Sequence, residues 1–121
     1  MQPLDVVVAT RDPQSSASLA VSLTRHFRSV SVAGSVEEIR RAIPKHRARL
    51  AVVDLELASL SEVRELCLQF DSTAIVCTHR IPDDEMWASA LAAGAIDCCQ
   101  NADVAGIVAA VQRNRKSRPA A

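Results

Sequence analysis

The chain has 121 residues, and its 14 basic and 14 acidic side chains give a formal net charge of zero at pH 7. This length predicts one domain spanning residues 1–121, and the balanced charge argues against a general attraction to nucleic acid or to membranes. The longest apolar run is too short to span a bilayer. The four cysteines lack the paired spacing of a zinc site, so we expect a cytoplasmic protein with reduced, mostly buried thiols.

The first part of the chain predicts two strands around a helix. Val6-Val7-Val8-Ala9 is a β-branched run that predicts a strand, and Asp12-Pro13 then supplies an N-cap and a first-turn proline. The helix is expected over residues 13–27, because apolar side chains recur there every four residues at Leu19, Leu23 and Phe27. Polar and apolar residues alternate over residues 29–33, which is typical of a half-buried strand.

The middle of the chain predicts two capped helices around a buried strand. Ser35 with Glu38, and Ser59 with Glu62, have the spacing of a capping box at a helix N-terminus. Between them, Leu50-Ala51-Val52-Val53 is an uninterrupted apolar run. Such a run is typical of a parallel strand that is buried on both faces of its sheet.

The last third of the chain predicts two further strands, over residues 74–78 and 96–100. A helix between them begins after Pro82 and ends at Gly94, which is a preferred residue for a helix C-terminus. An apolar stripe at helical spacing then predicts a last helix, with Asn101 as its expected N-cap.

Five strand signals therefore alternate with five helix signals, which predicts an α/β fold with a parallel sheet and helices on both faces. Asp54 stands at the end of the central strand, and open α/β sheets bind ligands at the carboxyl ends of their strands. The basic stretch of about residues 113–121 is expected to be a C-terminal tail or linker.

Three features of the chain resemble the receiver domain of bacterial two-component response regulators. Val53-Asp54-Leu55 resembles the end of that family's phosphoacceptor strand, and residues 90–97 resemble its A-x-x-A-G-A-x-D run. Thr78 lies where receivers keep a Ser or Thr that contacts the phosphoryl group, and it could contact the aspartate or only cap its strand. The resemblance covers essentially the whole chain. It implies a flavodoxin-like doubly wound sheet in strand order 2-1-3-4-5 with five helices.

The same alignment shows where the chain lacks the family's residues. Thr10 and Arg11 occupy the positions of the two acids that bind Mg²⁺ in receivers. Asn101 occupies the position of the family's lysine, and Cys98 that of its switch aromatic. Two like unit charges about 4 Å apart repel by about 4 kcal/mol at an effective dielectric constant of about 20, so an arginine here disfavours a metal cation. We expect Mg²⁺ binding to be lost or very weak, and we expect no other cofactor or metal.

Arg11 can instead serve as a direct partner of Asp54. A bidentate ion pair between the guanidinium and the carboxylate would fix one signalling state without phosphate. The alternative is that Asp54 is retained without a role.

The resemblance implies a signal-transduction module that acts by protein–protein interaction and is not an enzyme. Because the site lacks the acids and the lysine, we expect it to be atypical or phosphorylation-independent. A protein partner or a second copy is expected on the face made by the fourth helix, the fifth strand and the last helix, where Trp87 is a candidate contact. The family also suggests a histidine kinase as a partner.

Two alternatives remain open. The first is a conventional receiver that is phosphorylated at Asp54 and forms the input domain of a DNA-binding transcriptional regulator, with nucleic acid contacted only through a separate domain. The second is a phosphatase with an aspartyl-phosphate intermediate, for which Asp54-Leu55-Glu56 is only an approximate match to the D-x-D pattern.

Overall fold

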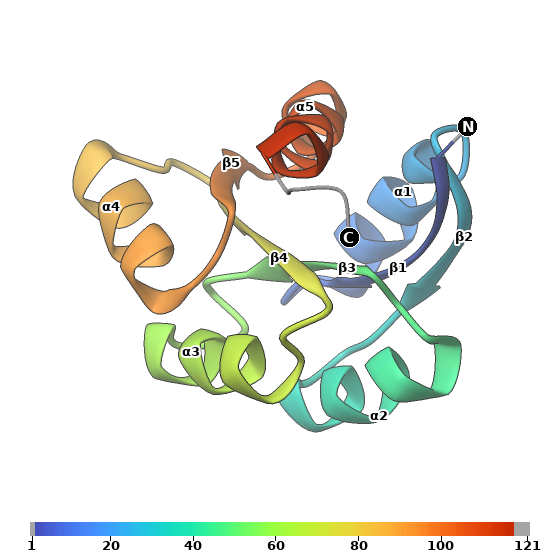
Figure 1. Cartoon of the computed structure of the whole chain (residues 1–121), viewed down its shortest axis with the longest axis horizontal. Coiled ribbons are helices and arrows are strands. Elements are labelled where there is room, and N and C mark those ends of the chain that lie inside the picture. Colours follow the sequence, from blue (N-terminus) through green and yellow to red (C-terminus); the bar gives the residue numbers. More distant parts are fainter. Residues whose placement is uncertain (1, 118–121) are drawn as a thin grey trace.

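The computed structural model describes residues 2–117. In this range, five helices cover a five-stranded parallel sheet in the order β2-β1-β3-β4-β5 (Figure 1). The strands are β1 (Gln2–Ala9), β2 (Phe27–Val32), β3 (Leu50–Asp54), β4 (Ala74–His79) and β5 (Asp97–Gln100). The helices are α1 (Pro13–Leu23), α2 (Val36–His46), α3 (Leu60–Gln69), α4 (Asp84–Ala93) and α5 (Val104–Ser117). The predicted fold class, strand order and flavodoxin-like topology are confirmed.

Alternation along the strands divides the core into two layers, one on each face of the sheet. Helices α2, α3 and α4 cover one face, and α1 and α5 cover the other (Figure 1). All five residues of β3 are buried, as expected for the central strand of a parallel sheet. Cys98 belongs to the first layer and Cys99 to the second, so these neighbouring thiols point away from each other.

The predicted capping boxes form to different degrees. In α3, Glu62 N–H donates to Oγ of Ser59 at 3.1 Å and Ser59 N–H donates to Oε1 of Glu62 at 3.0 Å, so the box is complete. In α2, Ser35 accepts from Glu38 N–H at 3.1 Å, but the Glu38 carboxylate accepts from Gly34 N–H at 2.6 Å. The predicted box of α2 is therefore incomplete, because Glu38 bonds to the N–H of Gly34 and not to that of Ser35.

Two helix boundaries were predicted wrongly. α1 ends at Leu23, and Phe27 is the first residue of β2, where its side chain is fully buried. After α1 the chain turns back, and Phe27 packs in the same core layer as Leu23. The four-residue spacing of these two side chains therefore arises although no helix connects them. The N-cap of α5 is Asp103, whose Oδ1 accepts from Gly106 N–H at 3.0 Å, and not Asn101.

The predicted C-terminal tail is partly helical. α5 continues to Ser117, and Arg113 within it donates to Oδ2 of Asp97 at 2.7 Å. Residues 118–121 lie outside the described residues. Within the described range, no helix combines the length and the apolar character needed to cross a membrane.

Candidate functional site

Four of the residues that the sequence singled out lie along the carboxyl edge of the sheet. Asp54 ends β3 and is the Cα partner of Thr78 in β4, while Thr10 and Asn101 directly follow β1 and β5. Thr10 and Asn101 also line one pocket of about 300 Å³ beside α1. Alternation directs the Asp54 and Thr78 side chains to the face covered by α1 and α5, because Val52 and Val76, two positions earlier, belong to that core layer.

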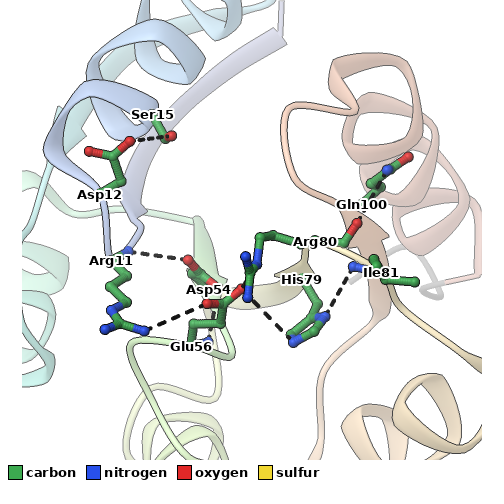
Figure 2. Close-up of polar contacts among 9 residues, drawn as sticks. All are labelled: Arg11, Asp12, Ser15, Asp54, Glu56, His79, Arg80, Ile81 and Gln100. Atoms are coloured by element: carbon green, nitrogen blue, oxygen red, sulfur yellow. Dashed lines mark hydrogen bonds and ion pairs between the residues drawn. The ribbon is translucent and has the colours of Figure 1, made fainter.

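The Asp54 carboxylate is held by main-chain donors. It is only 3% exposed, and its Oδ2 accepts from Arg11 N–H at 3.2 Å while its Oδ1 accepts from Glu56 N–H at 2.9 Å (Figure 2). Leu55 N–H donates to the Thr78 carbonyl at 2.9 Å, which joins the ends of β3 and β4. These bonds fix the carboxylate, but none of them brings a positive charge into contact with it.

The expected ion pair between Arg11 and Asp54 does not form, and that prediction was wrong. The Arg11 side chain is 74% exposed, and its Nη1 lies 3.8 Å from Oε2 of Glu56 (Figure 2). A guanidinium beside the buried Asp54 would lose most of its hydration, whereas next to Glu56 it stays in water. Arg11 therefore contacts Asp54 through its backbone and Glu56 through its side chain.

Glu56 is the centre of a charged cluster above Asp54. Its Oε1 accepts from Nε of Arg80 at 2.7 Å and lies 4.0 Å from Nε2 of His79 (Figure 2). His79 also accepts from Ile81 N–H through Nδ1 at 3.1 Å. Sequence reasoning missed Arg80. The signal that could have found it is the pairing of β3 with β4, which places the residues after Asp54 next to those after Thr78.

Thr78 and Asn101 each carry a buried oxygen that lacks a hydrogen-bond partner. Thr78 is fully buried, and neither its Oγ1 nor the Oδ1 of Asn101 forms a hydrogen bond within the described part of the chain. Thr78 thus makes neither of the two contacts that its position suggested. Buried polar atoms are nearly always paired in folded proteins, so each of these two oxygens has the capacity to accept a further partner.

The donors at this edge do not fit Mg²⁺. The Asp12 carboxylate accepts from Gln14 N–H at 3.2 Å and from the Ser15 hydroxyl at 2.9 Å, and it therefore caps α1. The Glu56 carboxylate is occupied by arginines. No three His, Cys, Asp or Glu side chains in the described range are grouped to hold a metal ion. Mg²⁺ demands near-ideal octahedral geometry, and both oxygens of the remaining carboxylate, Asp54, already accept backbone N–H groups.

Cys98, at the position of the switch aromatic, is buried beside a polar link between two helices. Its N–H donates to Oδ1 of Asp97 at 2.8 Å, and burial raises the pKa of its thiol. Asp97 also accepts from Nε1 of Trp87 in α4 at 3.0 Å and from Nη2 of Arg113 in α5 at 2.7 Å. Asp97 therefore bridges α4, β5 and α5, and Trp87 remains 47% exposed beside it.

Among solved structures, the chain is similar to a two-component response regulator of the LuxR family from an Aurantimonas species. The TM-score is 0.82 at 17% identity, over 99% of this chain and 90% of that one. The chain has the receiver-domain fold. The receiver domain of the putative response regulator NarL from Mycobacterium tuberculosis gives a TM-score of 0.76 at 21% identity, over 98% of this chain and all (100%) of that one.

A response regulator from Thermotoga maritima gives a TM-score of 0.81 at 19% identity, over 97% of this chain and 100% of that one. Neither a protein-family model nor a curated protein matches the sequence. Likeness at these identities shows the fold, and the residues of the site carry the functional argument.

Proposed function

We propose that the chain is a signalling module of the response-regulator receiver type that regulates a protein partner without phosphorylation of Asp54. The set of contacts at Asp54 carries this proposal. Two backbone N–H groups hold the carboxylate, while both nearby arginines, Arg11 and Arg80, are engaged by Glu56. These bonds hold the Asp54 carboxylate through the main chain, and among the described residues no cationic side chain pairs with it.

The chemistry of phosphoryl transfer supports this view. Transfer to a carboxylate depends on positioning and on cations that neutralise the developing charge, and a bound metal ion is the usual source. Arg11 stands where receivers keep an acid, and Asp12 is occupied as the cap of α1. With weak or no Mg²⁺ binding and no lysine at position 101, the carboxylate lacks the groups that make it a phosphoacceptor.

The α4-β5-α5 face is the surface through which the module would act. Asp97 connects Trp87 on α4 to Arg113 on α5, so one carboxylate links the two helices that border this face. Trp87 is a large, half-exposed aromatic side chain, and such residues often dominate the energy of protein interfaces. The partner would be another protein, a histidine kinase or a second copy of the chain, and the module would act by binding, not by catalysis.

The conventional alternative is an input domain of a DNA-binding regulator that is switched by phosphorylation of Asp54. It requires Mg²⁺ at the carboxyl edge and a rearrangement of the bonds at Asp54. A single NMR titration separates the two functions.

The test is an NMR titration of the ¹⁵N-labelled chain with beryllofluoride and Mg²⁺, which together mimic a phosphoryl group. With the concentration of monovalent cations held constant, we expect no shifts at the amides of Asp54, Thr78 and Asn101. A matched variant carries Thr10→Asp, Arg11→Asp and Asn101→Lys, and it should regain saturable shifts at Asp54. Saturable shifts in the unmodified chain that Asp54→Asn removes would establish the conventional alternative.

A further inference from the structure

The region between Asp54, Thr78 and Asn101 combines one buried negative charge with two unpaired neutral oxygens. Asp54 is 3% exposed and Thr78 is fully buried. Oγ1 of Thr78 and Oδ1 of Asn101 are both buried without a hydrogen-bond partner in the described part of the chain. A buried charge without a counter-charge, next to unsatisfied polar atoms, is unfavourable unless another group completes the site.

The strand register places these three residues on neighbouring strand ends at the carboxyl edge. Asp54 and Thr78 are Cα partners in β3 and β4, and the Asn101 N–H donates to the His79 carbonyl at 2.9 Å, which extends the β4–β5 pairing past the end of β5. Alternation places the Asp54 and Thr78 side chains on the α1 and α5 face of the sheet, and Asn101 follows β5 two residues past Cys99, the register partner of Thr78. The three residues therefore form a short row of oxygen ligands along one edge of the sheet.

We propose that this row binds a small monovalent cation such as Na⁺, K⁺ or NH₄⁺. The Asp54 carboxylate supplies the charge, and Thr78 Oγ1 and Asn101 Oδ1 supply neutral oxygens. Hard cations take oxygen ligands, and neutral oxygens are the ligands that bind K⁺ in channels. A single carboxylate balances one positive charge, so the site suits a monovalent ion better than a divalent one.

The pocket beside α1 gives solvent access to one of the three residues, Asn101. Its volume is about 300 Å³, and Thr10, Asn101 and Ala102 are among the residues that line it. Ala102 has a φ of 65°, a left-handed conformation that turns the chain directly after Asn101. The nearby guanidiniums do not compete for the site, because Arg11 and Arg80 direct their charges to Glu56.

The inference rests on the proposed function in one respect, namely that Mg²⁺ does not occupy this edge. The experiment compares thermal unfolding in the chlorides of Na⁺, K⁺, NH₄⁺ and choline at equal ionic strength, with a separate series in MgCl₂. We expect a saturable rise in Tm of a few degrees in at least one small cation over choline, because a ligand of the native state stabilises it. Equal Tm values in all four salts would overturn the inference.

Three variants assign the effect to the site. Asn101→Ala should remove the difference between the salts, and Ser18→Ala, at an exposed position in the same pocket, should retain it. Asn101→Lys supplies a tethered ammonium group, so it should raise Tm in choline and remove the response to added cations. An unchanged salt response in Asn101→Ala would contradict the inference.

NMR spectra in KCl, NaCl and NH₄Cl against choline chloride provide a second measurement that does not depend on variants. We expect saturable shifts at the amides of Asp54, Thr78 and Asn101 with at least one of these ions. Their absence with all three ions would overturn the inference and leave the proposed function intact. A saturable response to MgCl₂ that Asp54→Asn removes would instead contradict the proposed function.

Discussion

The backbone N–H of Arg11 donates to Oδ2 of Asp54 at 3.2 Å, across 43 residues of sequence. Arg11, which the resemblance aligns with a metal-binding acid, thus contacts Asp54 through its main chain, which nearly any side chain would allow. Its guanidinium is 3.8 Å from Glu56 and mostly exposed. The Arg11 side chain therefore changes the charge of this site. It does not set the position of the Asp54 carboxylate, which the backbone N–H holds.

The variant Arg11→Ala should therefore leave the fold and the position of Asp54 unchanged. The ion pair that it removes is exposed, and such pairs contribute about 0–1 kcal/mol to stability. Urea unfolding should show a change in the free energy of unfolding below about 1 kcal/mol. Glu56→Gln, which removes the acceptor of both arginines, is the matched comparison. A larger loss in Arg11→Ala, with shifts at the Asp54 amide, would mean that the guanidinium holds the site.

Gly94 is required at the end of α4. Its φ is 111°, and a Cβ atom there would lie 2.9 Å from Cβ of Cys67. Gly94→Ala should lower the free energy of unfolding by about 1–3 kcal/mol, because backbone strain and overpacking add. Gly34→Ala is the control, since its Cβ would meet only the end of the Glu38 side chain at 3.4 Å. Equal effects of the two substitutions in urea unfolding would contradict this account.

Asp5 links β1 to β2 and should titrate at unusually low pH. Hydrogen bonds from Arg28 and Ser29 lower the pKa of its carboxyl group to about 2 from an ordinary value of 3.8. The ionised form is favoured in the folded state, so its contribution to stability is present above about pH 3.8 and is lost as the pH falls through about 2. NMR titration of the side-chain carboxyl carbon measures this pKa directly.

In Arg28→Gln the pKa of Asp5 should rise toward 3.8, because the main cause of the shift is removed. Arg25→Gln, at an exposed position three residues before Arg28 in the sequence, should leave it near 2. A normal Asp5 pKa in the unmodified chain would refute the assignment of these hydrogen bonds.

The cysteines should react slowly with thiol reagents in the folded protein. Burial raises the pKa of Cys77 and of Cys99 to about 12, and the thiolate is the reactive form. Cys67 is only half buried and lines an open pocket, so it should be labelled first by a chromogenic disulfide at pH 8, and Cys67→Ser should remove that phase. Rapid labelling that persists in Cys67→Ser would contradict this order.

The same thiols predict a loss of stability in alkali. Their raised pKa values favour the neutral form in the folded state, so the stabilisation is complete below about pH 9 and is lost as the pH rises toward 12. Unfolding midpoints in urea at increasing pH would show this decline.

Local patterns predicted most of the fold because strands and helix caps depend on near neighbours. Ser59 and Glu62 form the box that their spacing indicates, and the apolar run before Asp54 is the fully buried β3. Phe27 was misassigned because a chain reversal can reproduce a helical spacing. Asn101 was predicted as the N-cap of α5, but the chain turns at Ala102, and Asp103 caps the helix instead.

The sequence predicted which residues lie at the carboxyl edge of the sheet, but it did not predict the direction of the arginine side chains there. Topology places Asp54, Thr78 and Asn101 at one edge, as the resemblance implied. The direction of a long arginine side chain depends on which carboxylate can be reached without desolvation, and spacing in the sequence does not encode that choice. The convergence of Arg11 and Arg80 on Glu56 is therefore visible only in the folded chain.

The most direct test of the proposed function is the intact mass of the chain after incubation with acetyl phosphate and Mg²⁺. An ordinary receiver domain treated in parallel serves as the positive control, and Asp54→Asn as the negative one. The account predicts no phosphoryl adduct on the unmodified chain under conditions that modify the positive control. An adduct that appears with Mg²⁺ and is absent from Asp54→Asn would contradict it.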